Sequence, residues 1–179
     1  MIIYKDRFTE DEMFSDSLKL VEVADGALIE FDSKKVTDTT DMSTVNIGAN
    51  ASAEEAPEDV DDIVEKKDYE IVIYHRVKYE ESKPTKAEFK SYIKRHLKKL
   101  VDVIKAEEGD AAADKFKAKA QPALMKIIKS YDDYDLYTGE KADFNDETSH
   151  CAVLLLNFRE DGITPYFTGI KADFIEEKV

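Results

Sequence analysis

A run of acidic side chains near the middle of the chain is the first group whose residue types and spacing could bind a ligand. Between positions 54 and 65 there are seven acids and no base. Carboxylate oxygens are the ligands that Ca²⁺ takes in proteins. The candidate calcium ligands are Glu54, Glu55, Glu58, Asp59, Asp61 and Asp62. A solvated run with no bound ion is the other interpretation of the same residues, and sequence alone favours it.

A second acidic stretch begins like an EF-hand loop at Asp133. In that alignment the third ligand position is Tyr137, the glycine comes one residue late, and position twelve is Phe144. An EF-hand needs oxygen ligands and a glycine at fixed places, so this stretch is not a calcium loop of that class. Its carboxylates are the alternative calcium ligands if the first run does not bind the ion: Asp132, Asp133 and Asp135.

Side chains that could act as catalysts are few and far apart in the sequence. The histidines are His75, His96 and His150, and no glycine-rich phosphate-binding motif is present. His96 lies in a helical stretch and is interpreted as packing at the edge of the core. Cys151 begins the apolar run 151–156, which is typical of a buried structural cysteine. We therefore expect that the chain is not an enzyme and requires no cofactor, with weakly bound Ca²⁺ as the candidate ion.

Basic residues gather in one part of this acidic chain. Positions 83–129 hold thirteen bases and six acids, a net charge of +7, and because the whole chain carries −14 the remainder carries −21. Four lysines are spaced by four, four and seven residues, which places them on one stripe of a helix: Lys90, Lys94, Lys98 and Lys105. A solvated helix face is the ordinary interpretation of such a stripe. The sharp segregation of charge favours a docking face for an acidic partner.

Hydrophobic periodicity predicts the helices that would carry these lysines. A capping box at Thr85 and Glu88, followed by apolar residues at helical spacing, predicts a helical hairpin over 85–131. Pro122 lies inside its second helix and predicts a kink or break near Ala118, because an interior proline removes a hydrogen bond.

Strands are predicted on both sides of this hairpin, at 2–4, 18–23, 27–31, 69–79, 134–137, 151–158 and 163–170. Asp25-Gly26 and the stretch 160–162 are predicted hairpin turns. The polar, acidic composition of 38–67 predicts a mobile loop, long enough to suggest a function of its own. Strands around one inserted helical hairpin predict an α+β fold, and we expect positions 1–179 to form a single domain.

The composition excludes several classes of protein. A net charge of −14 over 179 residues argues against general nucleic-acid binding. One cysteine cannot form an internal disulfide or a zinc site of several thiolates, which fits a reducing cytoplasm. No apolar run approaches the roughly 18 residues of a membrane span, and the first residues lack the apolar core of a secretory signal. We expect a monomeric cytoplasmic protein.

Two short motifs carry a resemblance to a known family. Positions 47–54 contain the first motif, with Gly48, Asn50, Ser52 and Glu54, and positions 134–140 begin the second, which continues to Phe158. Both resemble the signatures of the translationally controlled tumour protein family. The segments 1–6, 11–16 and 158–165 match as well, so the resemblance covers the whole chain in order.

The resemblance implies a β-tent core, similar to that of Rab-releasing exchange factors, with a helical hairpin insert and a mobile signature loop. It implies weak calcium binding, binding of tubulin and microtubules, contact with translation elongation factors, and support of cell growth and survival. Non-classical secretion is a further implication. Glu12 falls on an acidic position linked to activation of a Rheb-type small GTPase. Members often end in Lys-Cys, whereas this chain ends Lys178-Val179, so no disulfide-linked dimer through the last residue is expected.

Two hypotheses of function follow. The first is a multi-partner binding protein that binds calcium weakly and stabilises microtubules through a cationic helical face, and the +7 hairpin favours it. The alternative is a regulator of small-GTPase nucleotide exchange or of translation elongation factors, and Glu12 in an acidic surface segment favours it.

The acidic run yields a first testable prediction. Replacing the six candidate ligands within 54–62 by asparagine or glutamine should weaken calcium binding and leave the fold intact, since a solvated loop contributes little stability. Amide chemical shifts recorded by NMR during a calcium titration measure both effects. Calcium-induced shifts that survive the replacement unchanged would place the ion elsewhere, among Asp132, Asp133 and Asp135.

Overall fold

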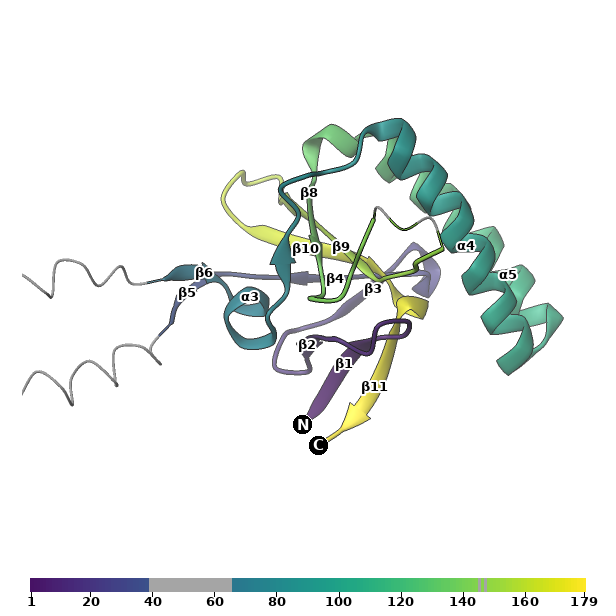
Figure 1. Ribbon diagram of the computed structural model, residues 1–179, viewed down its shortest axis with the longest axis horizontal. Helices are drawn as coiled ribbons and strands as arrows, with labels where there is room; N and C mark the ends of the chain where they lie inside the picture. Colours follow the sequence, from purple (N-terminus) through teal and green to yellow (C-terminus); the bar gives the residue numbers. More distant parts are fainter. Residues whose placement is uncertain (39–65, 145, 147) are drawn as a thin grey trace, which may run out of the picture.

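The computed structural model describes residues 1–38, 66–144, 146 and 148–179. Within these residues, strands both precede and follow one long helical hairpin (Figure 1). This arrangement is the α+β fold that the sequence predicts. None of the described helices is both long enough and apolar enough to cross a membrane.

The elements have the following bounds. The strands are β1 (Ile2–Asp6), β2 (Glu12–Ser15), β3 (Val21–Val23), β4 (Leu28–Asp32), β5 (Lys35–Thr37), β6 (Lys67–Tyr69), β7 (Lys78–Tyr79), β8 (Asp135–Thr138), β9 (Val153–Phe158), β10 (Pro165–Ile170) and β11 (Phe174–Lys178). The α-helices are α3 (Glu70–His75), α4 (Lys86–Glu108) and α5 (Asp110–Lys129). The described residues also form short 3₁₀ turns, namely η1 (Ala24–Gly26), η2 (Tyr131–Asp133) and η3 (Lys171–Asp173).

Most strands belong to an antiparallel sheet with the order β3-β4-β10-β9-β8-β7. A smaller sheet, β11-β1-β2, brings the two ends of the chain side by side (Figure 1). β5 pairs with β6, and the chain between them holds residues 39–65. Both predicted hairpins are confirmed, the first through η1 and the second through the turn at 160–162, where Gly162 has a φ of 71°.

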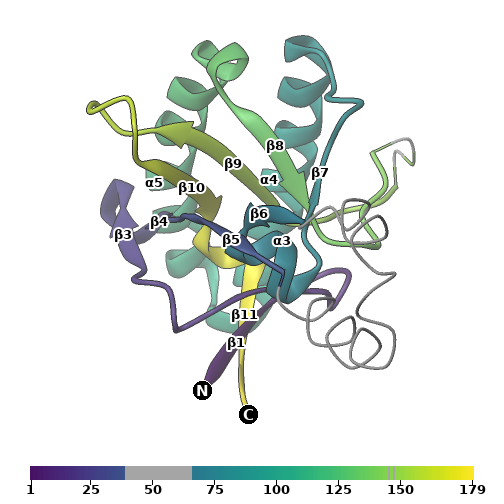
Figure 2. The ribbon, with the colours of Figure 1, turned by 90° about the vertical axis from the view of Figure 1, so that its left-hand side faces the viewer.

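The large sheet separates two hydrophobic cores. Along β9, Val153 and Leu155 point to the face that packs against α4 and α5. Leu154 and Leu156 point to the opposite face and pack with residues of β2, β4, β10 and β11. Figure 2 shows α4 and α5 behind β8, β9 and β10. Because β9 is buried on both faces, its sequence is apolar throughout instead of alternating.

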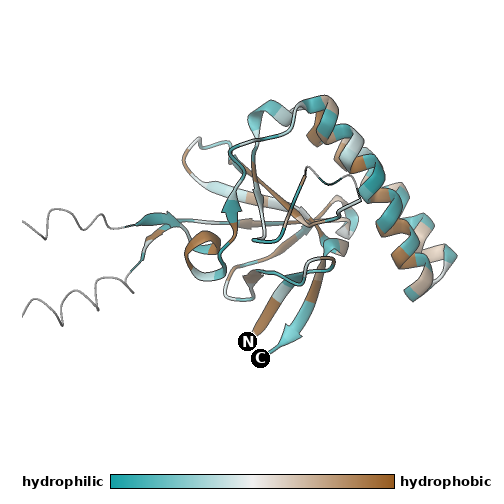
Figure 3. Ribbon diagram, in the orientation of Figure 1, coloured by the Kyte–Doolittle hydropathy of each residue, from teal (hydrophilic) through white to brown (hydrophobic). Residues whose placement is uncertain are grey.

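The helical hairpin begins where the capping box predicts. The Thr85 hydroxyl accepts a hydrogen bond from the Glu88 N–H (3.3 Å), and the Glu88 carboxylate accepts one from the Thr85 N–H (2.9 Å). Gly109, with a φ of 97°, supplies the sharp turn between the helices. Figure 3 shows the apolar stripe along both helices. The buried residues of α4 lie on one face: Phe89, Tyr92, Ile93, His96, Leu100 and Ile104.

Helix α5 runs through Pro122, so the predicted break near Ala118 is absent. A proline leaves the carbonyl four residues earlier without its N–H donor. Ala118 and Pro122 are both exposed. Water can therefore hydrogen-bond the released carbonyl, and the helix continues.

The predicted strand over 69–79 is wrong. Its middle forms the short helix α3, which lies against β2, and strand pairing resumes at β7. The β-branched run at 71–73 favours a strand by propensity, but such preferences yield to burial. One helical turn buries Ile71 completely and leaves Tyr74 63% exposed. The turn thus brings Tyr74 and His75 beside the start of β2.

A core substitution tests this layering. Leu154→Ala should lower the free energy of unfolding by about 2–5 kcal/mol, because Leu154 is fully buried between the large sheet and the small one. Ile163→Ala is the matched control. Ile163 is 79% exposed at the hairpin tip, so its truncation should change stability by less than about 0.5 kcal/mol. Urea denaturation of both variants measures the difference, and equal effects would contradict the two-core arrangement.

Candidate functional site

The lysine stripe lies on the outer side of α4. Lys94, Lys98 and Lys105 are exposed, whereas Lys90 is half-buried. Lys105 lies 3.5 Å from the Asp110 carboxylate at the start of α5. Within the described part of the chain, the side chains of Lys94 and Lys98 make no ion pair or hydrogen bond. The predicted stripe is therefore outward, with Lys94 and Lys98 as its most available charges.

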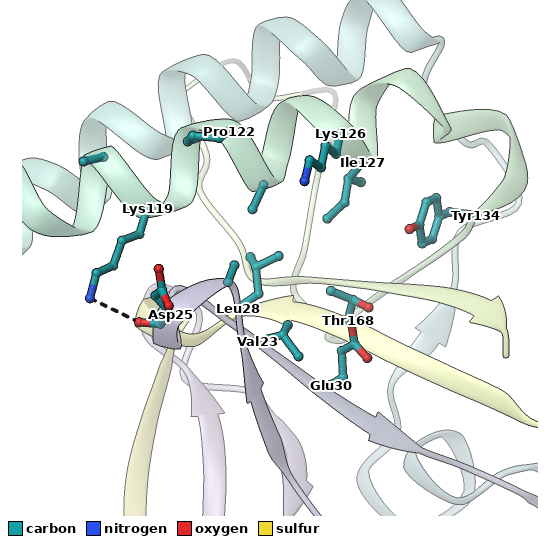
Figure 4. A pocket seen from close by; sticks show the side chains of 13 residues that line it. Val23, Asp25, Leu28, Glu30, Lys119, Pro122, Lys126, Ile127, Tyr134 and Thr168 are labelled. Carbon is teal, nitrogen blue, oxygen red and sulfur yellow. Dashed lines mark hydrogen bonds between the residues drawn. The ribbon is translucent and has the colours of Figure 1, made fainter. Parts of the chain in front are cut away.

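A groove on the other side of α5 does not extend this basic surface. It measures about 570 Å³ and lies between α5 and the β3–β4 edge of the large sheet (Figure 4). Lys119 and Lys126 line its helical wall, but Asp25 and Glu30 line the facing wall. Lys119 also donates to the Asp25 carbonyl oxygen at 3.3 Å. Charges of both signs therefore line this groove, and the lysine stripe on the outer side of the hairpin is separate from it.

Glu12 borders a second, acidic hollow of about 360 Å³ between β2 and α3. Asp11, Glu140, Tyr74 and Arg76 line it together with His75. The Glu12 carboxylate lies 3.6 Å from the His75 Nδ1, too long for a direct hydrogen bond. Burial lowers the pKa of His75, and the Glu12 charge opposes this shift in part. The hollow is consequently negative and carries an exposed aromatic ring.

Part of the second signature motif fixes the shape of this hollow. Asp11 accepts hydrogen bonds from the Lys141 N–H (2.8 Å) and from the Thr9 hydroxyl (3.0 Å). A Cβ on Gly139 would lie 2.7 Å from the Asp11 carboxylate, so any larger residue would displace it. Gly139 is thus required for the close approach of β8 to the segment that holds Glu12.

The calcium predictions receive no test from the described residues. Glu54, Glu55, Glu58, Asp59, Asp61 and Asp62 lie outside them, and so does the first signature motif with Gly48, Asn50 and Ser52. The alternative ligands Asp132, Asp133 and Asp135 are exposed around η2. In the described ranges, no three histidine, cysteine or acidic side chains lie close enough together to hold a metal ion.

A buried cluster of ionisable side chains was not predicted. The His96 Nε2 lies 2.5 Å from the Asp173 carboxylate, and both side chains are 1% exposed. The His96 Nδ1 lies 3.3 Å from the His150 Nδ1. Asp6 lies nearby and accepts hydrogen bonds from the Ala152 N–H (2.7 Å) and the Phe8 N–H (2.8 Å). Histidines far apart in the sequence therefore meet at one point, and His96 is a core residue instead of edge packing.

The ionisable groups of this cluster shift one another's pKa values: burial, with the Asp173 charge, raises the pKa of Asp6. Burial acts to lower the pKa of His96, but the Asp173 carboxylate outweighs it and the pKa of His96 is raised. Burial and the charge on His96 together lower the pKa of His150. When His96 is protonated, its two ring nitrogens can donate to the Asp173 carboxylate and to the Nδ1 of a neutral His150. The cluster joins α4 to η3 and to β1.

Cys151 is buried, as predicted, and has no reactive character. Its carbonyl accepts a hydrogen bond from the Tyr92 hydroxyl at 2.6 Å, and its N–H donates to the same oxygen at 3.1 Å. Burial raises the pKa of the Cys151 thiol to about 12. The thiolate form required of a nucleophile is absent at neutral pH.

The fold and these surfaces define a class of protein: an α+β domain with a sheet between a helical hairpin and a smaller sheet, and with charged outer surfaces of opposite sign. The chain belongs to the translationally controlled tumour protein family, whose sequence profile matches residues 1–174. That family is not known as a family of enzymes.

Individual relatives agree with this assignment over their full length. The chain is 38% identical to the translationally-controlled tumor protein homolog of Alternaria alternata, with all of both chains covered. It is 37% identical to the Xenopus laevis homolog, with 99% of both covered. The solved structure of the Schizosaccharomyces pombe protein p23fyp superimposes with a TM-score of 0.76 at 34% identity over all of both chains. The expected family and fold are confirmed.

The buried ion pair yields a prediction with a defined pH dependence. Asp173→Asn should destabilise the fold by on the order of 3 kcal/mol near pH 6, because it removes one partner of a buried pair. The pKa of His96 is raised in the folded state, so the stability it contributes is fully present below its unfolded pKa near 6.5 and is lost as pH rises through the folded value. The decrease in the free energy of unfolding caused by Asp173→Asn should therefore be smaller at pH 9 than at pH 6.

Denaturant unfolding at several pH values measures this change, and an NMR titration follows the His96 ring directly. The ring should titrate at lower pH in the variant. Asp110→Asn, which breaks the exposed pair with Lys105, is the control and should have little effect at any pH. A pH-independent loss in Asp173→Asn would show that His96 is neutral in the native protein.

Proposed function

We propose that this protein is a cytoplasmic multi-partner binding protein whose basic hairpin face binds acidic segments of other proteins, the acidic tails of tubulin among them. The observation that carries the proposal is the segregation of charge: positions 83–129 have a net charge of +7, whereas the whole chain has a net charge of −14. The exposed positions of Lys94 and Lys98 support it, since neither side chain has an ionic partner among the described residues. Such a face would raise the association rate with an acidic partner.

Energetics favour a distributed interaction over a single essential lysine. Exposed ion pairs contribute roughly 0–1 kcal/mol each. Binding therefore needs several lysines acting together, and it should respond to salt. By binding microtubules in this way the protein would stabilise them, and weak calcium binding by the acids at 54–62 would accompany that role. Support of cell growth and survival would follow from these contacts.

A regulator of small-GTPase nucleotide exchange is the second candidate function. The hollow around Glu12 supports it, because carboxylates and the exposed Tyr74 ring there suit a basic side chain of a partner. Contact with a translation elongation factor belongs to the same alternative. A nucleotide-exchange assay separates the candidates, since the first function requires no acceleration of exchange and the second requires one that Glu12→Val abolishes.

Charge reversal on the stripe tests the proposed function. Changing Lys90, Lys94, Lys98 and Lys105 together to glutamate should nearly abolish microtubule binding, whereas changing any one should weaken it only a few-fold. Binding of the native protein should weaken strongly with salt, since the Debye length falls from about 10 Å at 0.1 M to about 3 Å at 1 M. Co-sedimentation with microtubules measures both effects.

Glu12→Val is the control for this experiment. Glu12 lies in β2, in the acidic hollow and not on the hairpin face, so the variant should co-sediment as the native protein does. Binding that ignores salt, or that survives the four-lysine reversal, would make the lysine stripe a solvated surface without a docking role.

A further inference from the structure

The outer side of the hairpin contains a groove as well as a row of charges. It measures about 370 Å³ and lies where α4 and α5 run side by side. Six side chains line it: Lys94, Leu97, Lys98, Val101, Lys117 and Gln121. No acidic residue is among them. The lysine stripe therefore forms one rim of a depression and is not a flat surface.

The floor of this groove is apolar. Leu97 and Val101 are one helical turn apart on α4, between the buried face and the lysine stripe, and both are half-buried. Solvent thus reaches a short apolar line formed by Leu97 and Val101. A ligand that covered this line would gain the free energy of removing it from water.

The rim of the groove is cationic from both helices. Lys94 and Lys98 stand on the α4 side and Lys117 on the α5 side, and all three are exposed. As far as the described residues show, none of these ammonium groups forms an ion pair or a hydrogen bond. Because both rims carry positive charge, they would repel a second copy of this surface or a basic ligand. They match an acidic chain that lies between them.

We propose that this groove binds an acidic peptide segment that carries one apolar side chain, with the apolar side chain on Leu97 and Val101 and acidic residues on Lys94, Lys98 and Lys117. This inference rests on the proposed function and adds a rule of selectivity to it. An all-acidic segment pairs with the lysines of the rim but leaves Leu97 and Val101 exposed to water. A neutral apolar segment covers the floor but leaves three cations beside a dry surface without partners.

Three short synthetic peptides of equal length distinguish these cases. The first holds glutamate and glycine, the second replaces one central glycine by leucine, and the third replaces the glutamates of the second by glutamine. Burying a leucine side chain is worth roughly a tenfold or greater gain in affinity. Isothermal titration calorimetry at low salt should therefore show the second peptide binding at least tenfold more tightly than the first, and the third binding least.

Substitutions in the groove distinguish the contribution of its apolar floor to peptide affinity from that of its lysine rim. Val101→Thr should reduce the advantage of the leucine peptide and leave the affinity for the all-acidic peptide unchanged, because Val101 lines the groove. The double variant Lys94→Glu, Lys98→Glu should lower the binding affinity for both acidic peptides. Lys115→Glu is the matched control, because Lys115 is exposed on α5 but does not line the groove. Circular dichroism checks that each variant retains the fold.

The outcomes separate this inference from the function on which it rests. If the two acidic peptides bind with equal affinity, the apolar part of the groove has no role and this inference is wrong. If the Lys94 and Lys98 reversal also lowers that affinity, the proposed basic docking face is still supported. Tight binding of the neutral peptide overturns the role of the rim. If none of the three peptides binds, the groove is not a binding site. If the native protein also fails to co-sediment with microtubules, the proposed function is wrong as well. The expected order of affinities, together with a smaller advantage of the leucine peptide in Val101→Thr, supports the groove.

Discussion

The contact between His96 and Asp173 is the point at which the parts of this domain meet. His96 belongs to α4, Asp173 to the turn η3 that leads from the large sheet into β11, and Asp6 to the end of β1. With both partners 1% exposed, neither charge could remain in the interior alone. The pair therefore fixes where α4 crosses the domain, and with it the rotation of the helix about its own axis.

That rotation decides what the hairpin offers to other molecules. Once His96 and its apolar neighbours face the sheet, the lysines at 94 and 98 must face outward, and Leu97 and Val101 lie between the two sides. The outward lysine stripe and the groove beside it are thus consequences of how the core is packed. The acidic hollow at Glu12 arises separately, from the short helix α3 and the close approach of Asp11 to Gly139.

Local patterns in the sequence predict the features that depend on local chemistry. The capping box at Thr85, both hairpin turns and the lysine stripe could all be predicted, because each rests on residues close together in the chain. The helix at Glu70–His75 could not, since its β-branched run favours a strand and only burial of Ile71 against distant strands decides otherwise. The His96–Asp173 pair was missed for the same reason: it joins residues far apart in sequence. An acid placed directly between the apolar residues Ala172 and Phe174 was its one signal.

Acidic partners are proposed to bind the outer side of the α4–α5 hairpin. NMR chemical-shift mapping with a peptide copied from an acidic tubulin tail tests this proposal most directly. The shifted amides should cluster around Lys94, Lys98, Val101 and Lys117, and added salt should reverse the shifts. Shifts that cluster instead around Glu12 and Tyr74, or that persist in high salt, would contradict it.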